Sequence, residues 1–223
     1  MTAQRPRDAR GRVVRPPSPG LLFLIGLSVL LAACATTPDR PKARLLLPAP
    51  QSLPINTVTG DLIIAQLERA TVSLRALSWE ALQRFYGAQR DLIDPFADLP
   101  PPGNPRLTAF VLHLRNDSGD ALSFDPTAAT LADQEGRRKA PLDYPALYGT
   151  LAGLERGAER LRAIQRTVLT ATVVVPPGGE RRGLLLFPEL PADARAVLVD
   201  LASLYRGSAP QLVVFQFLVV EEP

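Results

Sequence analysis

Residues 107–116 alternate between two kinds of position, which is typical of a β-strand with one buried face. The side expected to face a core carries Phe110, Leu112 and Leu114. Residues 116–120 supply the turn-forming types Asn, Asp, Ser and Gly. Residues 121–124 and 130–132 then read as two further short strands. Three short strands with turns at this spacing predict an antiparallel β-sandwich.

Apolar runs elsewhere in the chain predict five more strands. They lie at residues 70–77, 170–175, 183–187, 196–201 and 212–220. The last run is apolar on both faces except at Gln216, so we expect a central strand that is covered on each side. The predicted fold class is therefore mainly β.

Two helical insertions interrupt the strands. Ser78 is placed to cap a short helix that ends near Gly87. The core-facing side of that helix would carry Trp79, Leu82, Phe85 and Tyr86. Apolar residues also recur at helical spacing over residues 147–168. That stretch contains three glycines, each costing about 1 kcal/mol relative to alanine, so we expect either a helix packed on the sheet or a mobile flap that meets a partner.

The most apolar segment precedes all these elements. Residues 20–34 carry no charge and end at the single cysteine, Cys34. Five arginines stand ahead of them, at positions 5, 7, 10, 12 and 15. A bilayer-spanning helix needs roughly 20 apolar residues, and residues 21–33 fall short of that length. The arginines and the lack of a polar face also disfavour a buried helix, whereas a basic flank before a short apolar core is typical of a secretory signal peptide.

The end of this segment, Leu31-Ala32-Ala33-Cys34, resembles the lipobox of bacterial lipoproteins. In that family the signal is cut before the cysteine, here between Ala33 and Cys34, and the cysteine carries the lipid. The resemblance implies a protein held on a membrane of the cell envelope through Cys34. By the same resemblance, Ala35 after the cysteine implies the outer membrane, with the domain facing the periplasm. The predicted divisions are a signal peptide at 1–33, the lipidated cysteine with a Pro-rich tether at 34–57, and a β-sandwich domain with helical insertions at 58–223.

The predicted tether contains five prolines between residues 35 and 57. Such composition favours an extended spacer of about 3.1 Å per residue, which would hold the domain off the bilayer. Leu45-Leu46-Leu47 interrupts this composition. We expect these leucines to dock either on the domain or on a partner.

Removal of the signal peptide would change the charge of the chain. The formal net charge is +3, and residues 1–33 contribute +4 because five arginines outnumber Asp8. The mature chain would therefore carry −1. Nucleic-acid binding is not expected, because domains that bind nucleic acids normally present a basic stripe. With Cys34 as the only cysteine, the domain has no internal disulfide and depends on its hydrophobic core.

The region 107–220 resembles uncharacterised bacterial lipoproteins with an immunoglobulin-like β-sandwich. The resemblance rests on Phe110–Asn116, residues 122–126, residues 131–136, and Pro177-Gly178 leading to Leu186-Phe187-Pro188. These are signatures of sheets and turns rather than of a site. The resemblance therefore implies a fold, an immunoglobulin-like antiparallel β-sandwich, and no activity.

Residues that could carry catalysis or bind metals are few. His113 is the only histidine, and it is expected on the solvated face of its strand, without a Gly-x-Ser-x-Gly motif in the chain. Zinc and copper sites draw on cysteine, histidine and methionine. The mature chain would offer only His113 and the lipidated Cys34, so we expect no such site. Three aspartates could bind calcium, but their role in turns explains them more simply. They are Asp117, Asp120 and Asp125.

A pair of acids, Glu155 and Glu159, lies one helical turn apart among Arg156, Arg160 and Arg162, as on a solvated helix face. Paired carboxylates would be needed for a cell-wall hydrolase, which we keep as an alternative. Without a catalytic set, we expect a non-enzymatic role in binding or assembly in the envelope. We expect no cofactor, and an envelope protein of unknown identity as partner, because strand edges commonly dock peptides. A carrier of small ligands or lipids is the other alternative.

Overall fold

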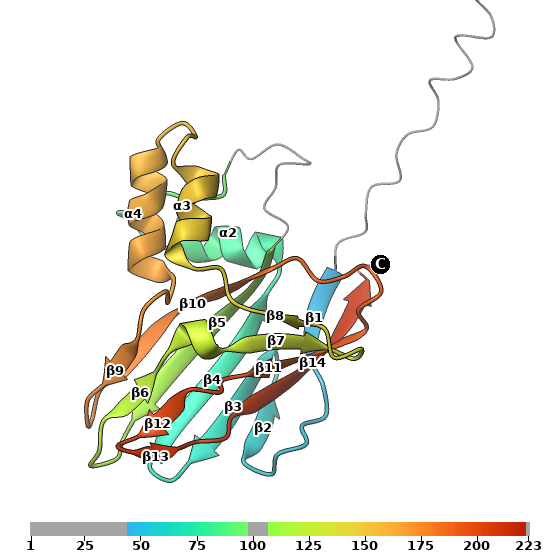
Figure 1. The fold of residues 1–223 in the computed structure, drawn as a ribbon, viewed down its shortest axis with the longest axis vertical. Helices are drawn as coiled ribbons and strands as arrows, with labels where there is room; N and C mark the ends of the chain where they lie inside the picture. The colour runs from blue at the N-terminus through green and yellow to red at the C-terminus, as the bar shows by residue number, and fades with distance from the viewer. Residues whose placement is uncertain (1–43, 98–106, 222–223) are drawn as a thin grey trace, which may run out of the picture. The chain divides into compact units, whose positions relative to one another are not determined.

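The computed structural model describes residues 44–97 and 107–221, whose strands form three antiparallel sheets (Figure 1). The β14 sheet is ordered β1 (Arg44–Pro48), β14 (Val214–Glu221), β11 (Ala196–Asp200), β7 (Thr130–Asp133) and β8 (Arg138–Lys139). The β5 sheet is ordered β10 (Glu180–Pro188), β5 (Leu107–Asn116), β4 (Ala70–Leu77), β3 (Leu62–Leu67) and β2 (Asn56–Thr59). The β12 sheet is ordered β13 (Ala209–Pro210), β12 (Leu204–Arg206), β6 (Leu122–Phe124) and β9 (Val173–Val175). The mainly β, antiparallel class predicted from the sequence is confirmed.

The main core joins the β5 sheet to the other two sheets. Strand β5 contributes Phe110, Leu112 and Leu114, all fully buried, which confirms the side expected to face the core. The ring of Phe110 lies 5.3 Å from that of Phe217 in β14 and 5.9 Å from that of Phe187 in β10, centroid to centroid. Each such side chain contributes about 1.5–3 kcal/mol when it is buried. These contacts therefore hold the sheets together as two layers.

Three helices cover part of the other face of the β5 sheet (Figure 1). They are α2 (Trp79–Gly87), α3 (Tyr144–Leu151) and α4 (Gly157–Thr167). A second core forms between them and Ala109, Val111, Leu184 and Leu186 of the sheet. Ser78 caps α2 as predicted, since its Oγ accepts a hydrogen bond from the backbone N–H of Ala81 at 3.2 Å. Of the two alternatives for the second insertion, packing on the sheet is the one observed.

The helical stripe predicted over residues 147–168 forms two helices rather than one, because α3 and α4 are separate. The break occurs at Arg156, which has a left-handed φ of +56°. A Cβ on the next residue, Gly157, would lie only 2.4 Å from the carbonyl oxygen of Ala152. Only glycine permits this close approach of two backbones, so Gly157 allows the chain to reverse between the helices.

The folded part of the chain begins earlier than we expected from the sequence. Residues 44–48, within the predicted tether, form β1 and pair with β14 along the edge of its sheet. Leu46 packs against the main core. Of the alternatives for the three leucines, docking on the domain is the one observed for Leu46.

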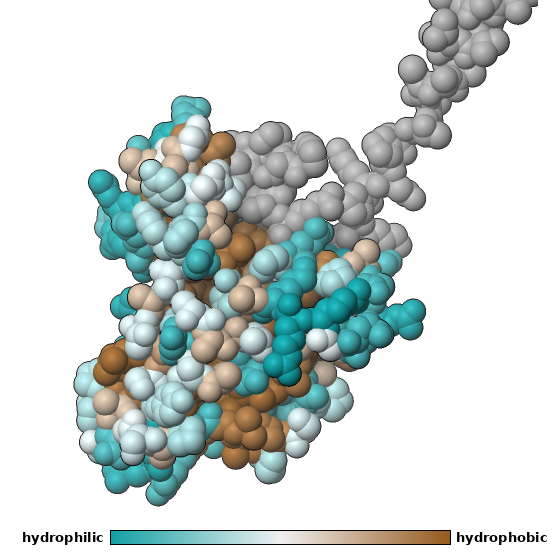
Figure 2. Space-filling model, in the orientation of Figure 1, coloured by the Kyte–Doolittle hydropathy of each residue, from teal (hydrophilic) through white to brown (hydrophobic). Residues whose placement is uncertain are grey.

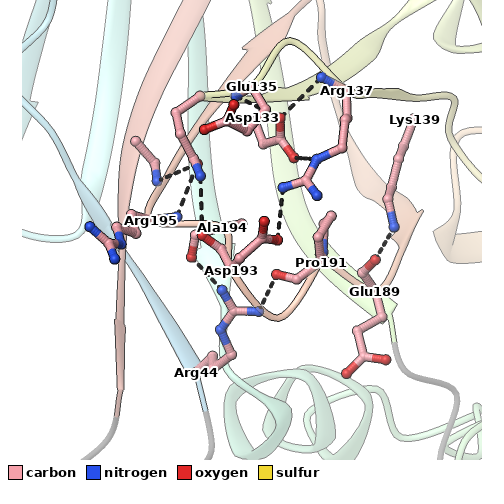
Figure 3. Close-up of polar contacts among 12 residues, drawn as sticks. Arg44, Asp133, Glu135, Arg137, Lys139, Glu189, Pro191, Asp193, Ala194 and Arg195 are labelled. Atoms are coloured by element: carbon pink, nitrogen blue, oxygen red, sulfur yellow. Dashed lines mark hydrogen bonds and ion pairs between the residues drawn. The ribbon is translucent and has the colours of Figure 1, made fainter.

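Two arginines attach the loop between β10 and β11 to the β14 sheet, and Figure 3 shows them approaching the loop from opposite sides. From β1, Arg44 donates hydrogen bonds to the carbonyl of Pro191 at 2.7 Å and to that of Ala194. From the other side, Arg137 donates to Asp133 Oδ2 at 2.6 Å and to Asp193 Oδ1 at 2.8 Å. The bond from Arg137 lowers the pKa of the Asp193 carboxyl. The start of β1 is thereby fixed by polar contacts as well as by strand pairing.

Strand β14 does not lie between two covering layers, so the prediction for residues 212–220 is wrong in this respect. Phe215 and Phe217 are fully buried on one face, but Leu218 on the opposite face is 44% exposed. Leu212, just before the strand, is 66% exposed. The three helices pack on the β5 sheet instead, so the β14 sheet keeps one apolar face uncovered by them. Figure 2 shows apolar residues at the surface over β14.

Candidate functional site

A recess of about 310 Å³ lies where the helical cover of the β5 sheet ends. Its walls come from β4, β5, β10 and α2, together with the turn between β2 and β3. The apolar residues on its lining are Ala76, Leu77, Ala81, Phe85 and Val111. Its charged lining residues are Asp61, Arg75, Arg84 and Arg182.

Strand pairing places two of these arginines on either side of β5. Arg75 of β4 pairs with Val111, and Arg182 of β10 pairs with His113. Alternate residues of a strand point to the same face, so both arginines lie on the face opposite the main core. The third, Arg84, comes from α2, which can reach this face because Ser78 caps the helix directly after the end of β4.

The arginines of the recess have few partners within the described residues. Arg75 Nε is buried and lies 3.3 Å from Asp61 Oδ1, yet no described group accepts a hydrogen bond from it. Arg84 Nε donates to the carbonyl of Glu80 on its own helix, at 3.4 Å. The guanidinium of Arg182 forms no hydrogen bond or ion pair with a described residue. Three guanidinium groups against one carboxylate leave the recess with an excess positive charge.

Beside the recess, the β5 sheet brings a serine, a histidine and a glutamate onto one face. Ser73 pairs with His113 across β4 and β5, and His113 Nε2 lies 3.2 Å from Glu180 Oε2. However, no hydrogen bond between Ser73 and the imidazole occurs within the described residues. Strand β4, which carries Ser73, pairs with β3 on one side and β5 on the other. Its backbone N–H groups therefore form hydrogen bonds within the sheet and do not form an oxyanion hole. His113 lies on the partly solvated surface of its strand, as expected.

Two of the three aspartates considered as calcium ligands have structural side-chain contacts, and the third, Asp120, accepts hydrogen bonds from Asn116 and Ser118 through its backbone carbonyl. Asp117 pairs with Arg115 at 3.0 Å, and Asp125 accepts hydrogen bonds from Thr127 at the start of a short 3₁₀-helix. Within residues 44–97 and 107–221, no group of His, Cys, Asp and Glu side chains is arranged to hold a metal ion.

The two acids considered for a hydrolase, Glu155 and Glu159, have different surroundings. Glu159 accepts hydrogen bonds from Arg156, which lower the pKa of its carboxyl. The surrounding arginines are not all solvated, since Arg160 is buried. Its guanidinium donates to the carbonyls of Pro95 and Ala97 at 2.8 and 2.7 Å, and to that of Glu155 at 2.8 Å. Arg160 therefore attaches α4 to the segment that follows α2.

The residues predicted for lipidation and cleavage, Leu31, Ala32, Ala33 and Cys34, lie outside the described residues. Within the part of the chain that the structure describes, no helix has the length and apolar character needed to cross a membrane.

The recess was missed by sequence reasoning. Its signals were an arginine in the alternating strand at 70–77 and a cap at Ser78, but only strand register shows that Arg182 lies nearby.

Comparison with known proteins gives no family for this chain. No protein-family model matches the sequence, and no curated protein matches it. One solved structure with a detectable likeness is that of the yjhA protein from Bacillus subtilis, at 12% identity and a TM-score of 0.29. The match covers 44% of this chain and spans 56% of the length of the other.

Proposed function

We propose that this chain is a lipid-anchored protein of the cell envelope with a non-enzymatic binding role in the periplasm. The recess on the β5 sheet is the proposed binding site. The anchoring part rests on the segment ending in Leu31-Ala32-Ala33-Cys34. The binding part rests on one observation, the recess with three arginines and one aspartate. The role requires no cofactor, and the anchor favours the outer membrane.

We further propose that the domain is an immunoglobulin-like β-sandwich with helical insertions. Its antiparallel sheets and the core shared by Phe110, Phe187 and Phe217 support this assignment. Fold alone names no activity, so the binding role is argued from the recess. Large side chains occupy the space between the sheets, which favours binding at the surface over carriage of a ligand inside.

The position of β1 sets how far the domain can stand from its anchor. Ten residue steps separate Cys34 from Arg44, where β1 begins. A fully extended chain rises by about 3.3–3.6 Å per residue. The first residue of β1 could therefore lie no more than about 35 Å from the lipidated cysteine.

Substitution of the cysteine tests the anchor. We expect the Cys34→Ser variant to lose lipid labelling and to remain as an uncleaved precursor, whereas wild-type protein should begin at a lipid-modified Cys34 by mass spectrometry. Thr36→Ser is the matched control, since it changes a hydroxyl residue nearby and leaves the cysteine intact. An unmodified Cys34, or residues 1–33 still attached in the mature wild-type protein, would contradict the proposal.

A further inference from the structure

The recess combines positive charge with an apolar wall. Arg75, Arg84 and Arg182 come from three different elements, two strands and a helix, and meet around one space. Phe85 and Val111 line the same space. Scattered arginines on a solvated surface need no ligand, but here the sheet and the helix hold them around a concave site. This combination is suited to a ligand with an anionic end and an apolar body.

The arginines offer donors that the protein itself does not use fully. Arg75 Nε is buried without a hydrogen bond to any described group, and a buried donor without a partner is costly. The guanidinium of Arg182 has no partner among the described residues. The planar guanidinium group matches the oxygens of phosphate in two-pronged hydrogen bonds. An anion in the recess would supply acceptors to these donors and neutralise the excess charge.

The single carboxylate does not cancel this preference. Asp61 Oδ1 lies 3.3 Å from Arg75 Nε, and its carboxylate is largely exposed, so solvent screens the pair. It can balance one arginine at most. Two guanidinium charges are left for a ligand.

We infer that the recess binds the phosphate group of an amphiphilic phosphate monoester or diester with a net negative charge, with the apolar part of the ligand against Phe85 and Val111. This inference rests on the proposed binding function and names its ligand class. The anchor keeps the site near a membrane, so two sources share this chemistry. One is the headgroup of a phospholipid within a bilayer, and the other is a free phosphorylated amphiphile.

The test uses the lipidated protein in discs of phosphatidylcholine, whose choline cation cancels the charge of its phosphate. The readouts are calorimetry and the fluorescence of the only tryptophan, Trp79 of α2. The soluble probes are hexyl phosphate, inorganic phosphate and hexanol. We expect hexyl phosphate to bind at least about tenfold more tightly than inorganic phosphate, since each buried methylene adds affinity. Hexanol should bind weakly, because it lacks the anion.

Two variants of adjacent arginines on β10 decide whether the recess is the site. Arg182→Gln should weaken hexyl phosphate binding by about tenfold. Arg181→Gln is the matched control: it removes the same charge from the opposite side of the strand and should leave the affinity unchanged. Circular dichroism checks that both variants are folded. Equal affinities for the two variants, or no gain from the hexyl chain, would overturn the inference.

Discs that contain anionic phosphatidylglycerol separate the two sources. If a bilayer headgroup occupies the recess, these discs should compete with hexyl phosphate in wild-type protein and not in Arg182→Gln. If they do not compete, the source is a free amphiphile. Failure of every phosphate probe, with lipid labelling of Cys34 intact, would reject this ligand class and leave the proposed anchored binding role to another ligand.

Discussion

At the scale of single residues, Asn116 connects the turn that follows β5 to the end of β9, which is distant in sequence. Its side chain donates to the carbonyls of Asp120 at 2.8 Å and Val175 at 2.9 Å, and its Oδ1 accepts from Ser118. The residue is fully buried. A buried amide that makes all these hydrogen bonds has its own donors and acceptor satisfied, and it also fixes the positions of its partners.

Replacement of this amide should therefore be costly. We expect Asn116→Ala to lower the free energy of unfolding by about 3 kcal/mol, because buried carbonyls and the Ser118 hydroxyl lose their partner. Urea denaturation would measure the change. Asp117→Ala is the control in the same turn, and its exposed ion pair with Arg115 should change stability by less than about 1 kcal/mol. A similar loss in both variants would mean that Asn116 acts through the turn alone.

The sequence predicted part of this arrangement. Residues 116–120 were expected to form a turn because their types favour one, and they do. The bond to Val175 spans 59 positions, and no local pattern contains that information. The same reason explains Arg160, which lies among helical arginines in sequence but is buried against Pro95 and Ala97 in space.

At the scale of elements, strands with a clear alternation could be predicted to within a few residues, as β4 and β5 were. The break between α3 and α4 could not. The apolar stripe continues across it, and the decisive feature is a backbone approach at Gly157. The covered faces of β14 also could not be predicted, because a strand pattern does not say on which sheet the helices pack.

Two glycines of the helical insertion should respond in opposite directions to the same substitution. Gly157→Ala would place a Cβ 2.4 Å from a backbone oxygen, so we expect it to destabilise the protein by about 1–3 kcal/mol. Gly149→Ala lies within α3 with open space around its Cβ, and should stabilise the protein by up to about 1 kcal/mol. Thermal and urea unfolding would measure both changes. Stabilisation by both would show that the reversal between the helices relaxes easily.

At the scale of the whole molecule, the candidate site depends on the register of three strands and the position of one helix. The sequence could supply Arg75, Arg84 and Arg182 only as separate charged residues. Their meeting follows from pairing of β5 with β4 on one side and β10 on the other, and from α2 beginning directly after β4. Pairing over such separations is a property of the folded chain, so the recess was outside the reach of sequence patterns.

The response of the whole domain to acid should report the contacts of Arg137, which attach the loop between β10 and β11 to the β14 sheet. The hydrogen bond from Arg137 lowers the pKa of Asp193 in the folded state. A carboxyl with a lowered folded-state pKa stabilises the protein above its unfolded pKa, and this contribution is lost as the pH falls below about 4. We therefore expect Arg137→Gln to be less stable than wild type at pH 7, with the difference shrinking towards pH 3. Urea unfolding at both pH values would measure this difference in stability. Arg138→Gln, at an exposed position, is the charge-matched control. A difference that stays constant with pH would show that Arg137 acts through packing rather than through the carboxylates.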